Sequence, residues 1–390
     1  MSGAAGAVDV FPADGLRNFL AFCRLPRLLY KGHEGFAPPL DADRWGLFSP
    51  RLNPHFKSVQ SRFWLARRNG KPAGRIFAQI YEEPSAPHNA SRAQFGCLDA
   101  IDDEEVVAGL TWAAEEWLRC QGASQLQGPF SPSINSESGL LIQGFTEVPM
   151  IAVPWHPPYL GALIEAQGYA KVHDLISYRY DVGEKDWKAE PGILARPEWR
   201  KRLNIRSVNL RYLKQEAEAI VDIFNDSWSE NWGFVPFTLE EFVSTAAAIK
   251  LVAPGKGKFM QGGLMIELDG KPQAFALVLP NLHEIMADLD GRLFPSGLLP
   301  LVARMRSHPY WSGRVALFGM RRALHRTWAG GVVILAFIAK LRQSLATTPV
   351  RQYEFGWVLE DNFGMRRPIE LSGGRVYKVH RIYEKRLAGN

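Results

Sequence analysis

The sequence predicts an α/β protein built from two tandem domains, each a mixed twisted sheet flanked by helices. Length and composition are the first reason: 390 residues, 46% of them hydrophobic, suffice for two domains with separate cores. The second reason is a repeated order of elements. A hairpin followed by strand, helix, strand, helix and strand is predicted twice along the chain, without close repetition of the sequence itself.

The first half begins with a helix over residues 16–29, where apolar residues recur at helical spacing. Residues 63–80 form two strand-like runs around Asn69-Gly70, and this dipeptide is the strongest short signal for a hairpin. The other elements predicted in this half are helix 106–120, strand 125–130, helix 159–167 before Gly168, and strand 174–182.

A polar stretch with prolines at residues 183–200 predicts a linker, so we expect an N-terminal domain at 1–186 and a C-terminal domain at 187–390. The second half repeats the plan of the first. Its predicted elements are helix 216–228, a hairpin over 265–280 with an Asp269-Gly270 turn, strand 315–320, an apolar helix ending at 345, strand 353–359, a helix ending at 371, and strand 376–384.

The cysteines and the apolar runs bear on the compartment. Cys23, Cys97 and Cys120 are widely spaced and form no CxxC pattern, so we interpret them as reduced core thiols. The first fifteen residues lack the features of a secretory signal. The longest apolar run, residues 328–339, is shorter than the about 20 residues of a membrane span and predicts a buried helix. These observations favour a cytoplasmic protein.

The basic residues are concentrated in one segment. Between Asp290 and Glu354 the chain has no carboxylate but ten basic residues; the other 36 basic residues face 40 acidic ones, so this segment accounts for the whole formal charge of +6. A phosphate-rich ligand or an anionic membrane surface is the favoured explanation, and a solvated basic face is the alternative. The ten residues are Arg292, Arg304, Arg306, Arg314, Arg321, Arg322, Arg326, Lys340, Arg342 and Arg351.

Near the end of the chain, strand 353–359 runs into Asn362 and then into a short helix closed by Gly373-Gly374. This order resembles the last region of the GCN5-related N-acyltransferase (GNAT) fold. A closer resemblance, to bacterial ceramide synthases and their uncharacterised double-GNAT relatives, covers residues 22–387. It is carried by five stretches: PFSPSINSESGLLIQGF, FNDSWSENWGFVPFT, DGRLFP, WVLEDNFGMRR and YKVHRIYEK.

The resemblance implies an acyl-CoA-dependent N-acyltransferase with no tightly bound cofactor and with acyl-CoA as its co-substrate. The implied amine is a sphingoid base, sphinganine or 3-oxosphinganine, and the product is a ceramide-type amide for bacterial sphingolipid synthesis. Because such substrates reside in bilayers, we expect the protein to associate peripherally with the anionic inner membrane. No nucleic-acid partner is expected.

In this fold the pyrophosphate of the acyl donor binds where the fourth strand turns into a helix, at the positive end of the helix dipole. Here that turn is GMRRALHRTWAGGVV, in which His325 stands among three arginines and Ala329 replaces the usual first glycine. Tight helix packing is the alternative explanation for the two glycines. The predicted donor-site residues, including strand N–H groups for the oxyanion, are Phe318, Gly319, Met320, Arg321, Arg322, Arg326, Gly330, Gly331 and Asn362.

Amide formation from a thioester needs a base for the amine and an acid for the leaving thiolate. Glu354 is the predicted base because it stands opposite the apolar face of a strand beside the implied acyl site; a salt bridge to an arginine is the alternative. In many GNAT enzymes a tyrosine seven residues after the asparagine acts as the general acid, but this chain has Ile369 at that position. Tyr377 and Tyr383 are the substitutes, although either could be a core tyrosine.

Two further stretches are candidates for binding the amine substrate. One follows an early helix of the second half and mixes large aromatic residues with amide and acid groups; a well-packed loop is the alternative. The other lies after a strand of the first half and would reach the site across the domain interface. Their predicted residues are Asp226, Trp228, Glu230, Asn231 and Trp232, with Asn135 and Glu137.

Other kinds of function find less support. The histidines show no HExxH spacing and no GxSxG motif occurs, so no metal site and no hydrolase is predicted. Two alternatives to the acyl-CoA-dependent enzyme stay open. One is an aminoacyl-tRNA-dependent transferase of the peptidoglycan type, which also uses two such folds, and the other is a non-catalytic protein that binds acyl-CoA or lipid.

Overall fold

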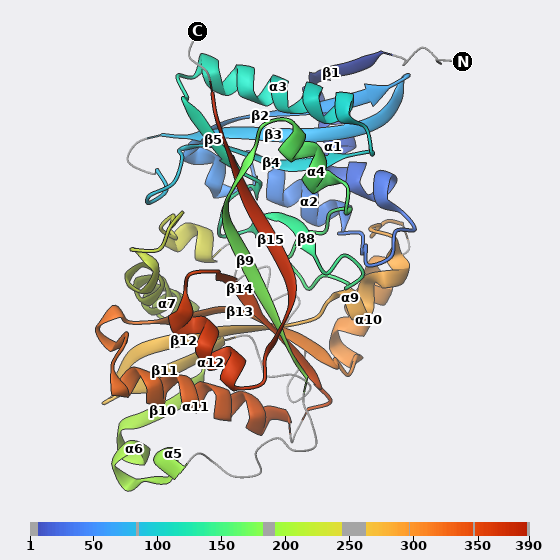
Figure 1. Ribbon diagram of the computed structural model, residues 1–390. Coiled ribbons are helices and arrows are strands. Elements are labelled where there is room, and N and C mark those ends of the chain that lie inside the picture. Colours follow the sequence, from blue (N-terminus) through green and yellow to red (C-terminus); the bar gives the residue numbers. More distant parts are fainter. Residues whose placement is uncertain are drawn as a thin grey trace.

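The computed structural model describes residues 7–82, 86–181, 192–243, 263–295, 297–345 and 348–387. The chain forms a large twisted mixed sheet with helices on both faces (Figure 1), as the predicted α/β class requires. Among the described residues, no helix combines the length and the apolar character needed to cross a membrane.

The N-terminal half contains the predicted hairpin between β2 and β3. Asn69 and Gly70 have φ angles of 51° and 72° at its turn, the left-handed conformation that an Asn-Gly pair adopts most readily. The helices of this half are α1 (Gly15–Tyr30), α2 (Asp41–Phe48), α3 (Glu104–Cys120) and α4 (Leu160–Ala166). Its strands are β1 (Val8–Pro12), β2 (Val59–Arg68), β3 (Lys71–Tyr81), β4 (Ala93–Ala100), β5 (Gln125–Gly128), β6 (Phe130–Ser131), β7 (Glu137–Ser138), β8 (Leu140–Gln143) and β9 (Ala170–Asp181).

The C-terminal half has the second predicted hairpin, between β11 and β12, with Asp269 and Gly270 at φ angles of 54° and 75°. Its helices are α5 (Gly192–Ala195), α6 (Pro197–Arg202), α7 (Leu213–Trp228), α9 (His283–Met286), α10 (Leu298–Ser307), α11 (Trp328–Leu345) and α12 (Phe363–Leu371). Its strands are β10 (Leu203–Ser207), β11 (Gly263–Leu268), β12 (Lys271–Pro280), β13 (Ser312–Met320), β14 (Gln352–Leu359) and β15 (Arg375–Arg386).

The strands of the two halves join in one sheet, in the order β1-β2-β3-β4-β5-β15-β9-β14-β13-β12-β11-β10. The last strand of the chain, β15, lies between β5 and β9, so it completes the sheet of the N-terminal half. In turn, β9 pairs with β14 of the C-terminal half. Figure 1 shows β9 and β15 crossing the molecule side by side. Each half therefore lends one strand to the junction between them.

Helix α11 contains the apolar run predicted to be a buried helix. Val333, Phe337 and Leu341 recur at a spacing of four residues and pack against a core that includes Val315 and Tyr353 of the sheet. The first residue of the run, Trp328, is 73% exposed, so the helix is buried along one side only.

Strands β13 and β14 are parallel neighbours over a short distance and then part. Their register runs from Ser312–Gln352 to Val315–Phe355 and ends there. Beyond this point β13 continues along β12, while the pairing of β14 with β9 shifts register between Phe355 and Val358. The residues of β13 that follow the last pair, 316–318, are half-buried. Within the described residues, the parting of the two strands leaves one edge of β13 without a strand partner.

Two expectations need correction. Cys23 and Cys97 are buried free thiols, but Cys120 is exposed because it ends α3 at the point where the chain turns outward. The expected linker over residues 183–200 is partly wrong, since residues from 192 onward form α5 and α6. Residues 182–191, which contain the proposed boundary at 186 and 187, lie outside the described residues, and the boundary stays a prediction.

The exchange of strands predicts that the halves do not fold separately. A fragment of residues 1–186 lacks β15, and a fragment of residues 187–390 lacks β9, so each leaves the sheet edges beside the missing strand unpaired. We expect each fragment alone to give no cooperative thermal transition in circular dichroism. Co-expression of both should restore one, and a cooperative transition in either isolated fragment would contradict the coupling.

Candidate functional site

The parting of β13 and β14 exposes backbone groups on one side of β13. The N–H of Arg321 donates to the carbonyl of Gln273 at 2.8 Å, on the β12 side. The N–H of Met320 points the other way and donates to Ser227 Oγ of α7 at 3.2 Å. Because N–H directions alternate along a strand, the N–H of Phe318 points to the same side as that of Met320. Of the three predicted oxyanion donors, Phe318 is therefore the best placed, whereas the Met320 N–H is engaged by Ser227.

Glu354 lies near the end of the pairing between β13 and β14, directly opposite Arg314. Its carboxylate is 1% exposed, and Oε1 is 2.9 Å from Arg314 Nε. Its other oxygen, Oε2, accepts a hydrogen bond from the hydroxyl of Tyr377. The predicted base and one predicted acid are thus in direct contact. The salt bridge considered as the alternative for Glu354 is also present, so the carboxylate has both kinds of partner.

Lys378 extends this network. It is fully buried, and its Nζ donates to the carbonyl of Val148 at 2.9 Å and to the hydroxyl of Tyr377 at 3.3 Å. Burial, which disfavours the charged ammonium, lowers the pKa of Lys378 to about 8. Burial and the adjacent Glu354 carboxylate raise the pKa of Tyr377 well above its ordinary value. We refer to Arg314, Glu354, Tyr377 and Lys378 together as the buried polar cluster.

A loop of the N-terminal half, residues 144–156, covers the buried polar cluster. Besides Val148, it offers the carbonyl of Ile151 to Arg314 and that of Pro154 to the buried imidazole of His380. Arg314 also donates to the carbonyl of Gly356, at 2.9 Å from Nη2. Three backbone carbonyls of the N-terminal half, together with that of Gly356, therefore satisfy buried donors of this region, as such groups require.

Two predicted residues have roles away from the cluster. Tyr383 is buried in the core of the N-terminal half, and its hydroxyl donates to Glu165 at 2.9 Å. It belongs to the part of β15 that pairs with β5, so we remove it from the candidate acids. Asn362 is the N-cap of α12, and its Oδ1 accepts from the N–H of Met365 at 3.2 Å. The sequence signal around Asn362 is explained by this cap.

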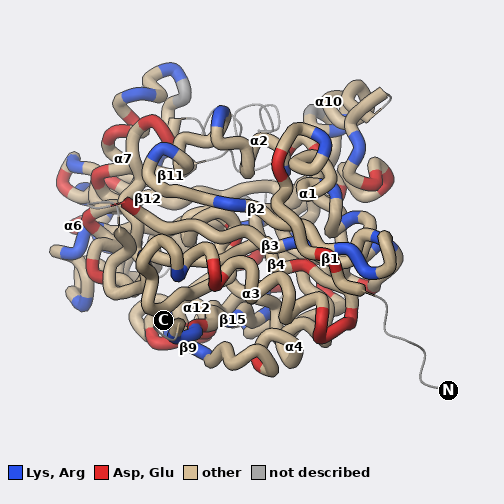
Figure 2. The backbone as a smooth tube through the Cα atoms, turned by 90° about the horizontal axis from the view of Figure 1, so that it is seen from above, with Lys and Arg blue, Asp and Glu red and all other residues tan. Residues whose placement is uncertain are grey.

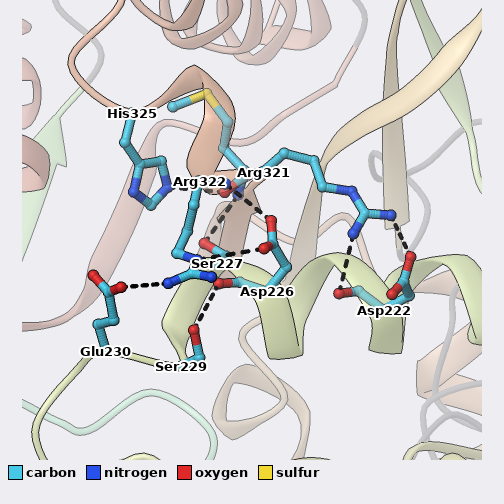
Figure 3. A network of polar contacts seen from close by, with 9 residues as sticks. Asp222, Asp226, Ser227, Ser229, Glu230, Arg321, Arg322 and His325 are labelled. Carbon is cyan, nitrogen blue, oxygen red and sulfur yellow. Dashed lines mark hydrogen bonds and ion pairs between the residues drawn. The ribbon is translucent and has the colours of Figure 1, made fainter.

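The predicted phosphate loop and part of the predicted amine site face each other (Figure 3). Arg321 pairs with Asp222 of α7. The backbone N–H of Arg322 donates to Asp226 at 3.0 Å, and its side chain pairs with Asp226 and with Glu230. Two of the three arginines predicted to bind phosphate, Arg321 and Arg322, thus hold carboxylates of α7 and of the turn after it. An incoming anion would compete with these carboxylates.

The glycines after the loop differ in their surroundings. A Cβ at Gly330 would lie 2.1 Å from the carbonyl oxygen of Leu324, so this glycine is required for the packing of the loop. A Cβ at Gly331 would meet nothing within 4 Å, so there is room beside this residue, but its N–H already donates to the carbonyl of Thr327 at 3.1 Å. Thr327 precedes the helix and caps it, accepting from the N–H of Gly330 through Oγ1. Arg326 is exposed, with φ at 58°. The packing alternative holds for Gly330 only.

The other predicted amine-binding residues have partners within the protein, and two of them, Asn135 and Trp232, join the two halves. Asn135 donates to the carbonyl of Val235 at 3.1 Å, and Trp232 packs against His173 with ring centroids 4.5 Å apart. Glu137 is paired with the buried Arg44. Trp228 stacks on Phe224, and the backbone of Asn231 bonds to Trp228 and Phe234. The expected contact of Asn135 across the interface between the halves is present, but its side-chain amide binds the carbonyl of Val235.

The acid-free segment does not form a continuous basic face. Arg304 pairs with Asp288, Arg314 with Glu354, and Arg321 and Arg322 with carboxylates of α7. Figure 2 shows Lys and Arg interspersed with Asp and Glu over the molecule. Acids distant in sequence therefore neutralise much of the segment.

The corresponding gap in the N-terminal half is closed. Strands β4 and β5 share a single residue pair, Gln94–Gln127. Beside them, a Cβ on Gly96 would lie 1.6 Å from the carbonyl oxygen of Phe130, so the chain after β5 lies directly against β4. The turn from β4 into α3 is acidic, with the carboxylates of residues 102–105 where the C-terminal half has its arginines. Asp103 and Glu105 of this turn pair with Arg68, so the turn has carboxylates in place of the arginines that could bind an anion.

Sequence reasoning missed Arg314, Lys378 and loop 144–156. Lys378 stands inside a predicted strand between Tyr377 and Val379, and Arg314 directly precedes the predicted strand 315–320; a charge within or beside an apolar strand can signal a buried charge. The loop carries no comparable signal, because its contribution consists of backbone carbonyls.

Comparison with known proteins identifies two relatives along nearly the whole chain. Protein YghO of Escherichia coli (strain K12) is 36% identical over 381 residues, covering 96% of this chain and 93% of that protein. The bacterial ceramide synthase of Caulobacter vibrioides is 33% identical over 390 residues, covering 97% and 98%. No family model matches the chain.

Solved structures support the fold. A tandem GNAT protein from the clavulanic acid biosynthesis pathway superimposes with a TM-score of 0.56 at 15% identity, covering 98% of this chain and all of that one. A GCN5-related N-acetyltransferase from Sphaerobacter thermophilus gives 0.52 at 14% identity, covering 97% and 96%. The tandem GNAT architecture expected from the order of elements is confirmed.

The lowered pKa of Lys378 predicts a pH-dependent stability. The folded pKa of about 8 lies below the ordinary value of 10.5, so the unfolded chain holds the proton more strongly. The resulting penalty is fully present below pH 8 and is relieved as the pH rises towards the unfolded value. Relative to Lys378→Met, which cannot titrate, the wild type should gain about 2 kcal/mol of unfolding free energy between pH 8 and 10. Urea titrations at both pH values measure this, and a pH-independent difference would contradict it.

Proposed function

The chain belongs to the N-acyltransferase family that includes the bacterial ceramide synthase of Caulobacter vibrioides, and we propose that it transfers an acyl group from acyl-CoA to a sphingoid base. The amine would be sphinganine or 3-oxosphinganine, and the product a ceramide-type amide. The observation that carries the proposal is the buried polar cluster, in which Glu354 and Tyr377 meet beside the parting strands β13 and β14.

In this proposal the acyl donor binds to the C-terminal half. Its thioester carbonyl would lie along the open edge of β13, where the N–H of Phe318 is directed. The pyrophosphate would take the loop of Arg321 and Arg322 and the start of α11, where the helix dipole favours an anion and the absence of a side chain at Gly331 leaves room for one. Because the equivalent region of the N-terminal half is closed and acidic, we propose one donor site per chain.

The reaction follows from the geometry of Glu354 and Tyr377. Glu354 is 1% exposed whereas Tyr377 is half-buried, so Tyr377 is the member of the pair that reaches a substrate. The amine attacks the thioester carbon, the C–N bond forms, and the oxyanion is held by the Phe318 N–H. The proton of the amine passes to the Tyr377 oxygen while the hydroxyl proton moves to Glu354. When the C–S bond breaks, Tyr377 protonates the thiolate and recovers a proton from Glu354.

The positive charge near the cluster supports these steps. Arg314 lies 2.9 Å from Glu354 and remains charged, so it stabilises the carboxylate that awaits the next proton. Lys378 donates to the Tyr377 hydroxyl and thereby orients its proton towards Glu354. Both cations are anchored by carbonyls of loop 144–156, which makes the N-terminal half part of the catalytic arrangement.

A lipid amine and a lipid product also imply contact with a bilayer. Arginines of the acid-free segment that are paired with carboxylates offer little free charge to a bilayer. We therefore do not propose the whole segment as the docking surface.

Glu354→Gln tests the chemistry. The variant keeps the size of the side chain and an acceptor for Tyr377 but removes the proton acceptor, so turnover of sphinganine with acyl-CoA should fall by about 10² to 10⁴-fold at neutral pH. Acyl-CoA affinity should stay nearly intact, and the loss should shrink at high pH, where free amine is abundant.

Glu360→Gln is the matched control, because Glu360 follows the same strand but pairs with Lys171. Its turnover should be near normal. Near-normal turnover of Glu354→Gln in the same assay would place the base elsewhere.

The arginine loop gives a second test, in calorimetry of CoA binding. Replacing Arg321 and Arg322 by alanine should weaken binding by about tenfold and flatten its dependence on salt. Glu230→Gln should have the opposite effect, because it removes a competitor for Arg322. Since Glu230 is largely exposed, the gain should be modest, about two- to fivefold. Unchanged affinity in both variants would mean that the pyrophosphate binds elsewhere.

A further inference from the structure

Helix α10 and the turn before it present apolar side chains to solvent. Phe294 is 72% exposed, Leu299 83%, Leu298 39% and Val302 36%. They fall within nine residues of chain, and the last three share one side of the helix. The helix is anchored to the molecule through Leu301, which is buried in the core that also contains Met286 of α9. This ridge is therefore a firmly held apolar surface and not a frayed end.

We propose that the ridge of Phe294, Leu298, Leu299 and Val302 is the surface on which this protein docks to an anionic lipid bilayer. Side chains of this kind on the outer side of an interfacial helix insert into the boundary between headgroups and acyl chains. Figure 1 shows α10 on the outer side of the molecule, next to α9 and on the same side as α2.

The charges around the ridge suit an anionic surface. Arg292 is exposed beside Phe294 and has no ion pair within the described residues. Lys31 and Arg304 flank the same region and are paired with Asp290 and Asp288. From residue 291 to residue 353 the chain contributes no carboxylate of its own. Basic residues near a bilayer each add about 1 kcal/mol of attraction, so the apolar ridge must supply the rest.

A second copy of the chain fits this ridge less well. Four apolar side chains are far fewer than the roughly 20 to 30 residues a side of a stable interface. A symmetric contact would also bring Arg292 of both copies together, which like-charge repulsion opposes. A bilayer imposes neither requirement.

The ridge is connected to the buried polar cluster through a shared core. Ile151 of loop 144–156 packs against the core that contains Leu301 of α10 and Met286 of α9. Val148, whose carbonyl holds Lys378, is itself 52% exposed. Docking through α10 would therefore bring a membrane-resident amine to the side of the molecule where loop 144–156 covers Tyr377. The delivery of the amine rests on the proposed function, whereas the docking itself does not.

The test is flotation with vesicles of phosphatidylcholine and 30% phosphatidylglycerol, at low salt and without substrate. Phe294→Ser with Leu299→Ser should lower the bound fraction by about tenfold or more, because two inserted apolar side chains are lost. Leu371→Ser is the matched control, since Leu371 is 89% exposed but lies on α12. It should float like the wild type on the anionic vesicles. Both proteins should float more weakly on vesicles of pure phosphatidylcholine.

Three outcomes would overturn the proposal: wild type that does not float, equal flotation of the double variant, or a wild-type dimer in light scattering that the double variant dissociates, which would assign the ridge to a second copy. Turnover with a short-chain, water-soluble amine separates this from the proposed function. The double variant should retain this turnover fully. If the wild type turns over no amine at all, the result counts against the proposed enzymatic function and not against docking.

Discussion

The ion pair between Arg314 and Glu354 is the contact on which the centre of this molecule depends. It joins β13 to β14 at the last residues before the strands separate, and Arg314 also binds the carbonyls of Gly356 and Ile151. Loss of one partner would leave a buried charge uncompensated, which costs about 3–5 kcal/mol in proteins. The gap between β13 and β14, which we assign to the acyl donor, therefore begins beside this ion pair.

The N-terminal half owes its importance to backbone groups more than to side chains. Its loop 144–156 accepts hydrogen bonds from Arg314, Lys378 and His380, and its strand β9 separates β14 from β15. The half that is closed to a donor of its own thus supplies the acceptors that keep the buried cations of the other half in place. A tandem arrangement with exchanged strands makes this contribution inseparable from the fold.

Charge in this protein is arranged in facing pairs. Arg321 and Arg322 of the loop before α11 contact carboxylates of α7 and of the turn after it, so the sites inferred for donor phosphate and for amine are two sides of one network. An anionic donor that takes over Arg322 would release Asp226 and Glu230 towards a cationic amine. Binding of the two substrates is then expected to be mutually favourable for electrostatic reasons.

Local pattern determined much of the structure. Asn69-Gly70 and Asp269-Gly270 specify their hairpins through φ angles that few other residues adopt, the spacing of Val333, Phe337 and Leu341 specifies the packed side of α11, and Glu354 stood out inside its strand. The partners of Glu354 were decided only by tertiary structure, since Arg314 is forty residues away and the loop that holds Lys378 lies in the other half. The same exchange of strands carries Tyr383 into the N-terminal core while Tyr377, on the same strand, stays at the cluster. Pairing between distant strands has no counterpart in sequence periodicity, because periodicity reports which face of a strand is buried and not which strand lies beside it.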